Sequence, residues 1–199
     1  MTEQPRRIYL IRHALPDFGE EGRRCIGRTD LPLGEVGRAQ ASAMGRWMAT
    51  RGLTAVYSSP LQRALQTAQC LGPRVIGVPG LVEMDMGAWE GMGFDEIQRA
   101  YPEAYAERGR DIAHVPAPGG ESFVQCGARA WGAFRDVIEQ SAGNIAIVAH
   151  RGVNRTLLCR IQGRNLSEVL SIPQPFSSVN TLCESEQKLT LCTLGEVVY

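Results

Sequence analysis

The chain has 199 residues, which suits a single domain over residues 1–199 because about 70% of the surface of an unfolded chain this long can be buried. Lys plus Arg equals Asp plus Glu at 21 each, which argues against a nucleic-acid binder or a membrane-surface protein. An anionic partner must then be bound locally. Lys188 is the only lysine, and the planar guanidinium of arginine suits phosphate or carboxylate.

The sequence shows no sign of export or membrane insertion. Residues 8–11 form an apolar run between charges that is too short for a signal peptide, and no stretch approaches a membrane span. We therefore expect a cytoplasmic protein. Six cysteines without CxxC spacing are expected to be free thiols without a metal or redox role, although the last two could face each other across a hairpin: Cys25, Cys70, Cys126, Cys159, Cys183 and Cys192.

The first predicted element is a buried strand over residues 8–11 that ends at Arg12 and His13. In open α/β sheets ligands bind outside the carboxyl ends of the strands, so both side chains are placed where chemistry occurs. A polar loop over residues 17–33 follows. Helical spacing then predicts a helix over residues 34–51, with Val36, Ala39, Ala43 and Trp47 toward the core and Met44 and Met48 beside them.

The next predicted unit is a strand over residues 54–57 followed by a helix to about residue 71. Ser59 is expected to cap this helix and Pro60 to occupy its first position, which leaves Arg63 near the end of the strand. A short β-like run lies in residues 73–80. A Gly-punctuated segment over residues 81–92 carries Glu83, Asp85 and Glu90.

The second half contains an insertion and a second copy of the strand that ends in histidine. Residues 93–119 include a short helix, a charged stretch and a Pro-rich end, and are expected to cap the sheet. Three further helices are predicted, at residues 121–141, 152–161 and 166–170. Three further strands are predicted, at residues 144–149, 177–183 and 189–194. The first of these strands ends at His150. Alternating strands and amphipathic helices predict a three-layer α/β/α sandwich with a largely parallel sheet.

Five side chains are expected to gather at the carboxyl ends of these strands: Arg12, His13, Arg63, Glu83 and His150. Two guanidiniums, two imidazoles, a helix N-terminus and a carboxylate can bind a tetrahedral dianion and transfer it without a metal. One neutral histidine would attack phosphorus, and a carboxylic acid would protonate the leaving oxygen. Glu83 is preferred as that acid, with Asp85 and Glu90 as the alternatives.

Six segments in this order resemble the histidine phosphatase superfamily, which has the phosphoglycerate mutase-like fold: IRHALPD, GRTDLPLGEVGRAQA, YSSPLQRALQTA, LVEMDMGAWEG, PGGES and IVAHRGVNR. The resemblance implies that His13 is the phosphorylated nucleophile, that Arg12 and Arg63 bind phosphate, and that Glu83 is the general acid. It also implies that His150 is charged and stabilises the transferring phosphoryl group. No metal or cofactor is implied. We further assign Asp17, Gly27, Arg28 and Arg151 as possible substrate contacts.

The sequence departs from the family pattern near these residues. Ala14 replaces a common Gly, and Gly19 stands where many members have an Asn. Asp17 would repel a dianion unless it turns away or pairs with an arginine. Arg151 replaces a Gly beside His150 and is interpreted as either a surface residue or an extra cation for the substrate.

The resulting hypothesis is a metal-independent phosphomonoesterase that hydrolyses a small phosphorylated metabolite, as a monomer or homodimer. The segment CIGRTDLPL is similar to α-ribazole phosphatases and suggests α-ribazole 5′-phosphate as a substrate. A phosphoglycerate mutase is the first alternative, but Met84 and Met86 stand where dimeric mutases have Arg and Tyr. The second alternative is an inactive binding module. The third is a metalloenzyme that uses His13, His150 and Glu83 as ligands, but the neighbouring arginines would repel a divalent ion.

Overall fold

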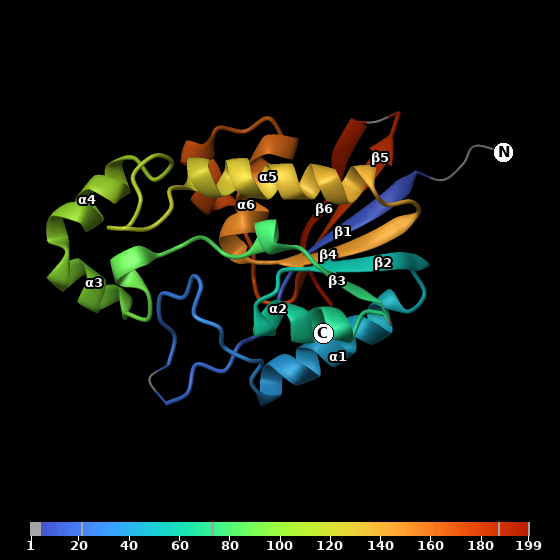
Figure 1. Ribbon diagram of the computed structural model, residues 1–199, viewed down its shortest axis with the longest axis horizontal. Coiled ribbons are helices and arrows are strands. Elements are labelled where there is room, and N and C mark those ends of the chain that lie inside the picture. Colours follow the sequence, from blue (N-terminus) through green and yellow to red (C-terminus); the bar gives the residue numbers. More distant parts are fainter. Residues whose placement is uncertain (1–4, 21, 73, 187, 199) are drawn as a thin grey trace.

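The computed structural model describes residues 5–20, 22–72, 74–186 and 188–198. Its centre is a six-stranded sheet in the order β3-β2-β4-β1-β5-β6 (Figure 1). The strands are β1 (Arg6–Arg12), β2 (Leu53–Ser58), β3 (Val75–Gly77), β4 (Asn144–Ala149), β5 (Ser178–Ser185) and β6 (Lys188–Val197). The first four strands are mutually parallel, whereas β5 pairs antiparallel with both β1 and β6. The predicted largely parallel sheet is therefore confirmed.

Helices cover both faces of the sheet, which gives the predicted three layers. They are α1 (Glu35–Met48), α2 (Gln62–Gln69), α3 (Phe94–Ala100), α4 (Pro102–Arg110), α5 (Phe123–Glu139) and α6 (Arg151–Ile161), with 3₁₀ turns at Pro79–Leu81, Gly87–Trp89 and Leu166–Ser171. One hydrophobic core joins α1 and α2 to the sheet, and a second joins α5 and α6 to its other face (Figure 1). Within the described ranges, no helix is long and apolar enough to cross a membrane.

The inward face of α1 differs from the prediction by about one position. Val36 is 59% exposed and Ala39 is also exposed, whereas the buried positions are Gly37, Gln40, Ala41, Met44 and Met48. A close contact with the first loop sets this rotation, since a Cβ on Gly37 would lie 1.9 Å from the Leu15 carbonyl oxygen. Gln40 is buried because its Oε1 accepts the Leu15 N–H at 3.0 Å. Hydrophobic spacing alone could not reveal either contact.

The start of α2 also differs from the prediction. The helix begins at Gln62, and its backbone N–H donates to Asp30 Oδ1 at 2.6 Å. Ser59 lies before the helix, where its Oγ accepts the Leu61 N–H at 3.3 Å and also contacts His150 Nε2 at 2.7 Å. The predicted cap was therefore wrong, because a carboxylate from a distant loop accepts the first N–H of the helix, whereas Ser59 binds a backbone N–H one residue before the helix.

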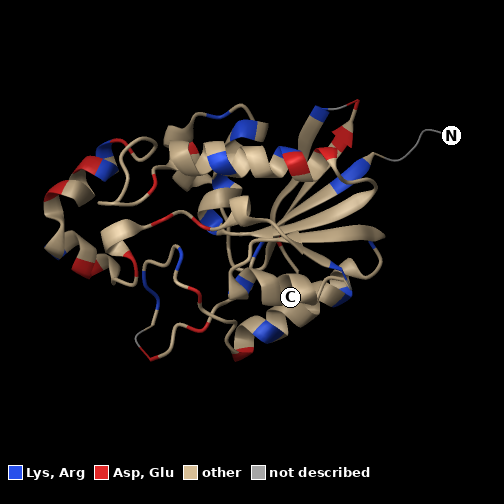
Figure 2. Cartoon of the chain, viewed as in Figure 1, with Lys and Arg blue, Asp and Glu red and all other residues tan. Residues whose placement is uncertain are grey.

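The insertion over residues 93–119 lies beyond the carboxyl ends of the strands as the expected cap (Figure 1). Its charged stretch forms α4, with Pro102 in the first turn. Arg108 anchors α4 from within, because its guanidinium donates to the Val115 carbonyl and lies over the rings of Trp89 and Phe123 at 5.9 and 5.5 Å. Both signs of charge occur on the outer side of the cap helices (Figure 2).

One cysteine prediction is wrong. Cys183 on β5 and Cys192 on β6 form a disulfide with their Cα atoms 6.2 Å apart. The antiparallel pairing of the two strands brings these residues together, as the expected hairpin allowed. Cys25, Cys70, Cys126 and Cys159 are free thiols, as predicted.

Candidate active site

Two histidines meet because β1 and β4 are adjacent and parallel. Arg12 is in register with Ala149, and the backbone N–H of His13 donates to the Ala149 carbonyl at 3.0 Å. The imidazole rings of His13 and His150 consequently lie 5.1 Å apart, between centroids, and both are buried. Repetition of a strand ending in histidine thus produces a pair at one point of the sheet edge.

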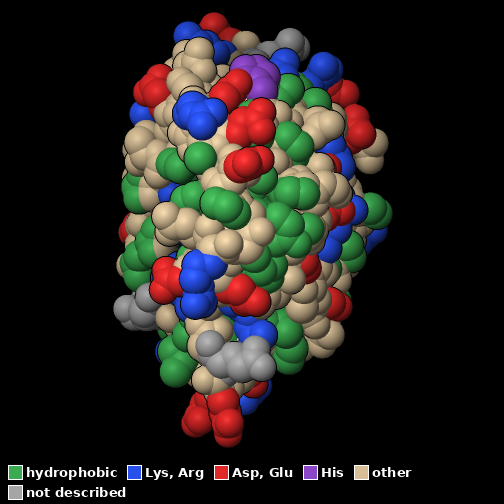
Figure 3. Space-filling model, turned by 90° about the vertical axis from the view of Figure 1, so that its left-hand side faces the viewer, with side chains coloured by type: hydrophobic (Ala, Val, Ile, Leu, Met, Phe, Trp, Pro, Cys, Tyr) green, Lys and Arg blue, Asp and Glu red, His purple; other side chains and the backbone are tan. Residues whose placement is uncertain are grey.

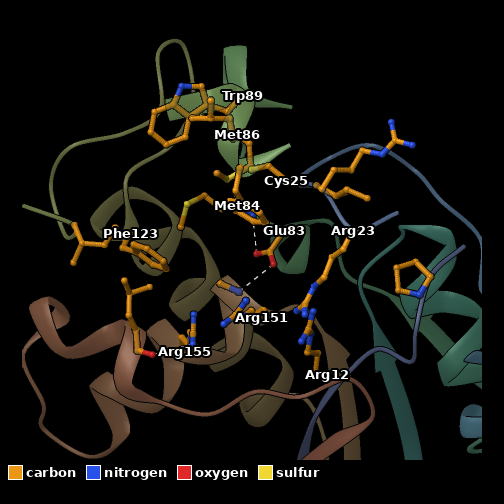
Figure 4. A pocket seen from close by; sticks show the side chains of 18 of the residues that line it. Arg12, Arg23, Cys25, Glu83, Met84, Met86, Trp89, Phe123, Arg151 and Arg155 are labelled. Atoms are coloured by element: carbon orange, nitrogen blue, oxygen red, sulfur yellow. Dashed lines mark hydrogen bonds between the residues drawn. The ribbon is translucent and has the colours of Figure 1, made fainter. Parts of the chain in front are cut away.

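A cavity of about 420 Å³ lies between this sheet edge and the cap. Four of the five residues predicted to gather there line it, namely Arg12, His13, Arg63 and Glu83. Arg151 lines it as well, and Figure 4 shows Arg151 beside Arg12 and Glu83. His150 lies next to His13 and is fully buried. The volume is in the range of small-molecule sites.

The tautomer of His13 follows from one hydrogen bond. His13 Nδ1 lies 2.7 Å from the carbonyl oxygen of Ala14, which can only accept, so Nδ1 carries the proton. Burial lowers the pKa of His13 well below its usual value, and the charges of Arg12 and Arg63 lower it further. The ring is therefore neutral at pH 7, with an unprotonated Nε2 available as a nucleophile.

The surroundings of His150 favour its neutral form, whereas the resemblance implied a charged ring. Burial lowers its pKa well below the usual value, and Arg63 and His13 add to the effect. Its Nε2 contacts Ser59 Oγ at 2.7 Å, while Nδ1 is buried and makes no hydrogen bond to the described residues. A phosphate dianion beside the ring would favour the charged form.

The lowered pKa values of these two histidines predict that the folded protein loses stability in acid. A lowered pKa in the folded state means that the unfolded chain binds more protons once the pH falls below about 6.5. The free energy of unfolding should then decrease as the pH falls, by up to about 1.4 kcal/mol per pH unit for each histidine. Denaturant unfolding of His13→Asn between pH 6.5 and 5 should show a shallower dependence than the wild type.

The matched control for this prediction is His114→Asn. His114 is exposed on the cap and pairs with Asp111 at 3.0 Å, so its removal should not make the pH dependence shallower. Carboxylates that titrate in the same range contribute equally to all three proteins and cancel in the comparison. Equal slopes for wild type and His13→Asn would show that His13 is not buried in its neutral form.

The two arginines predicted to bind phosphate are buried, and some of their N–H groups donate to backbone carbonyls. Arg12 Nη1 donates to the Gln174 carbonyl at 2.6 Å. Arg63 donates from its two terminal nitrogens to the carbonyls of Thr29 and Gly27 at 2.7 and 2.6 Å. A guanidinium has five N–H donors, so each side chain is fixed in place with donors left for a ligand in the cavity.

Glu83 is held at the N-terminus of α6. Its Oε2 accepts the Gly152 N–H at 3.0 Å, and its Oε1 accepts the N–H groups of Met84 and Val153 at 2.9 and 3.3 Å (Figure 4). Glycine at position 152 is required for this position of the carboxylate, since a Cβ there would lie 2.6 Å from Glu83 Oε1. The carboxylate is thereby held at the cavity wall.

The two alternative carboxylates lie outside the cavity. Glu90 accepts the backbone N–H groups of residues 27–29 at 2.8 to 3.2 Å. Asp85 accepts the Gly87 N–H at 2.9 Å and pairs with Arg28. The geometry therefore favours Glu83 over both as the acid.

Three of the four possible substrate contacts are placed elsewhere. Asp17 is exposed, and its Oδ1 accepts the Gly19 N–H at 3.0 Å, so it turns away as considered above. A Cβ on Gly27 would lie 2.2 Å from the Met84 carbonyl oxygen, which explains the glycine by packing. Arg28 pairs with Asp85 and Glu121 at 3.3 and 3.4 Å. None of these three residues lines the cavity, which places them away from the expected substrate position.

Several cavity residues were not found from the sequence. The Arg12 guanidinium lies 3.7 Å from the ring centroid of Phe176, and that ring lies 5.6 Å from the His13 ring. Arg23 and Arg155 also line the cavity. One signal was available for Phe176: an antiparallel strand beside β1 must begin where β1 ends, so the segment before β5 reaches the site.

The chain matches the family model described as Histidine phosphatase superfamily (branch 1) over residues 8–196. It is 38% identical over 152 residues to a bifunctional protein of Mycobacterium tuberculosis, covering 73% of this chain and 41% of that protein. The chain thus spans less than half of that relative.

Two further comparisons cover nearly the whole chain. Phosphoserine phosphatase 1 of Hydrogenobacter thermophilus is 28% identical over 201 residues, with 96% of this chain and 95% of that protein covered. The structure of a putative α-ribazole-5′-P phosphatase from Escherichia coli superposes with a TM-score of 0.87 at 25% identity, and the match covers 98% of each chain.

Proposed function

Because the chain belongs to branch 1 of the histidine phosphatase superfamily, we propose that it hydrolyses a small phosphomonoester through a phosphohistidine at His13, without a metal. The observation that carries this proposal is the contact of His13 Nδ1 with the Ala14 carbonyl at 2.7 Å, which leaves Nε2 unprotonated. Arg12 and Arg63 line the same cavity, and their positive charges favour a phosphate dianion over a divalent cation.

In the first step, His13 Nε2 attacks phosphorus, the N–P bond forms and the ester P–O bond breaks. Arg12 and Arg63 stabilise the charge on the equatorial oxygens, and His150 lies beside the transferring group. Glu83 in its protonated form gives its proton to the leaving alcohol oxygen. The Ala14 carbonyl stabilises the cationic phosphoimidazole through the Nδ1 proton.

In the second step, water attacks the phosphohistidine and the N–P bond breaks. Glu83, now a carboxylate, accepts a proton from the water, which returns both residues to their starting forms. Inorganic phosphate then leaves. His13 begins and ends the cycle neutral, which agrees with the lowered pKa that burial and the arginines impose on it.

α-Ribazole 5′-phosphate is one proposed substrate. The solved structure reported above supports it by overall likeness, and the apolar side chains of the cavity could accept its aromatic base. The mutase alternative stays second, because Met84 and Met86 line the cavity where dimeric mutases have Arg and Tyr, and a thioether gives no donor to a carboxylate. The carboxylate of a phosphoglycerate would have to be bound by other arginines of the cavity. An inactive module is disfavoured because His13, Arg63, Glu83 and His150 are all in place.

The proposal is tested by an assay in the presence of a chelator. p-Nitrophenyl phosphate is used beside α-ribazole phosphate, phosphoserine, 3-phosphoglycerate and sugar phosphates, with intact mass measured after a quench that avoids acid. We expect metal-free hydrolysis and a mass increase of one phosphoryl group. Folded protein that turns over none of these compounds and gains no mass would contradict the proposal and favour the inactive module.

A further inference from the structure

The cavity holds more positive charge than one phosphate requires. Besides Arg12 and Arg63, the side chains of Arg23 and Arg151 line it (Figure 4). The guanidiniums of Arg12 and Arg23 lie 3.7 and 5.6 Å from the centroid of the same Phe176 ring. That ring is also 5.6 Å from the His13 ring, so Arg12, Arg23 and His13 all lie around Phe176.

Arg23 and Arg151 have no acidic partner in the described part of the chain, where neither takes part in an ion pair. They also repel their neighbours. Burial and then Arg151 lower the pKa of Arg12 to about 9, and the pKa of Arg151 is lowered by burial and then by Arg23. Glu83 is the only carboxylate among the described residues that line the cavity, and backbone N–H groups occupy both of its oxygens.

One phosphate dianion can be balanced by Arg12 and Arg63 alone. The charges of Arg23 and Arg151 would then remain uncompensated in a partly enclosed space. A second acidic group on the ligand would relieve this repulsion and form charge-assisted hydrogen bonds, which are stronger than neutral ones. The arrangement of the cations therefore points to a ligand with two anionic groups.

Arg24, Arg108 and Arg155 also line the cavity, the last two with guanidiniums that donate to backbone carbonyls, and most of the remaining wall is apolar. Met84, Met86, Trp89 and Phe123 line it on the side of the cap, and hydrophobic side chains gather across the middle of the face seen from the cap end (Figure 3). Among its described lining residues there is no Ser, Thr, Asn or Gln, and Tyr105 is the only one with a hydroxyl. Sugar hydroxyls would find few side-chain partners there, and unpaired polar groups are costly to bury.

We infer that the cavity selects a phosphomonoester with an apolar body and a second acidic group, which Arg23 and Arg151 bind. The phosphate lies at His13, between Arg12 and Arg63, and the apolar body lies against the side chains of the cap side. This inference rests on the proposed function and deepens it, since it names the substrate class. It assigns Arg23 and Arg151 as specificity-determining residues, and it disfavours α-ribazole 5′-phosphate, which has ribose hydroxyls and no second acidic group.

The test compares substrates that differ in one charge. kcat/KM is measured for 3- and 4-carboxyphenyl phosphate and for the matching carbamoylphenyl phosphates, which have nearly the same shape and leaving group. Wild type should prefer at least one acid over its amide by about 10- to 100-fold, the size expected of a charge-assisted hydrogen bond. Arg151→Ala and Arg23→Ala should each reduce this preference, because kcat/KM should fall more on the acids than on the amides.

The control variant is Arg135→Ala, which removes the same charge from an exposed pair with Glu139 on α5 and should leave the preference unchanged. A preference of wild type for neither acid, or one that both cavity variants retain, would overturn the inference while leaving the phosphatase proposal intact. Calorimetry with carboxybenzyl- and carbamoylbenzyl-phosphonates separates binding from turnover. Tighter binding of an acid, lost in Arg151→Ala, would support the inference even if hydrolysis were absent.

Discussion

His13→Ala is expected to lower turnover of any phosphomonoester by on the order of 10³-fold or more while the fold remains intact. The substitution removes the only protein atom in the proposed mechanism that forms a bond to phosphorus. Neighbouring charges cannot replace it, because guanidiniums bind phosphate but do not act as nucleophiles. Steady-state kinetics with p-nitrophenyl phosphate and intact mass after mixing with substrate measure both consequences, the loss of turnover and the loss of the phosphoryl adduct.

His114→Ala is the control for this variant, since it makes the same change on the exposed surface of the cap. It should retain both turnover and the adduct. Circular dichroism and the unfolding midpoint of His13→Ala show whether the fold persists, and His13→Gln provides a second variant of more similar volume. Turnover near the wild-type level in either His13 variant, or an adduct that persists in it, would refute the phosphohistidine.

The centre of the site was predictable because it depends on strand ends. A buried β-run that stops at a functional side chain places that side chain at the sheet edge, and two such runs in one parallel sheet place theirs together. His13 and His150 follow from this rule, and their backbones are linked through Ala149 as neighbouring parallel strands require. Arg63 follows because the first turn of a helix after a strand lies at the same edge.

The parts that escaped prediction depend on contacts between segments distant in sequence. Asp30 caps α2 from another loop, and Gly37 is fixed by the carbonyl of Leu15. The disulfide between Cys183 and Cys192 required knowledge of strand pairing. Spacing within one element carries no information on such partners, so the type of element was predicted more accurately than its phase or ends.

The loop over residues 27–29 has a different role from the one expected. Glu90 accepts three of its backbone N–H groups, and the carbonyls of Gly27 and Thr29 in turn accept from Arg63. Glu90 is therefore linked to Arg63, the proposed phosphate-binding residue, through the backbone of this loop. A carboxylate near a site in sequence can thus act through positioning, which separates Glu90 from Glu83 on structural grounds.

Glu83→Gln is expected to reduce kcat/KM by about 10²- to 10⁴-fold for substrates with a basic leaving alcohol, and much less for p-nitrophenyl phosphate. A basic alkoxide needs a proton as the P–O bond breaks, whereas an activated phenoxide leaves without one. Glutamine keeps the size of the side chain and an oxygen that can accept the Gly152 N–H, but it has no proton to give. The ratio of the two losses therefore reports proton transfer apart from any disturbance of the fold.

Glu90→Gln is the matched control, since it makes the same change in a carboxylate that lies outside the cavity. Glu90→Gln should weaken the hydrogen bonds that hold the loop against Arg63. This should lower kcat/KM by a similar factor for both kinds of substrate, because both need the same phosphate binding before the leaving group departs. A loss in Glu83→Gln that is equal for alcohol and aryl substrates would assign the proton to another group, and Asp85→Asn would then be the next variant to measure. A loss confined to alcohol substrates identifies Glu83 as the acid, because positioning alone cannot distinguish leaving groups by their basicity.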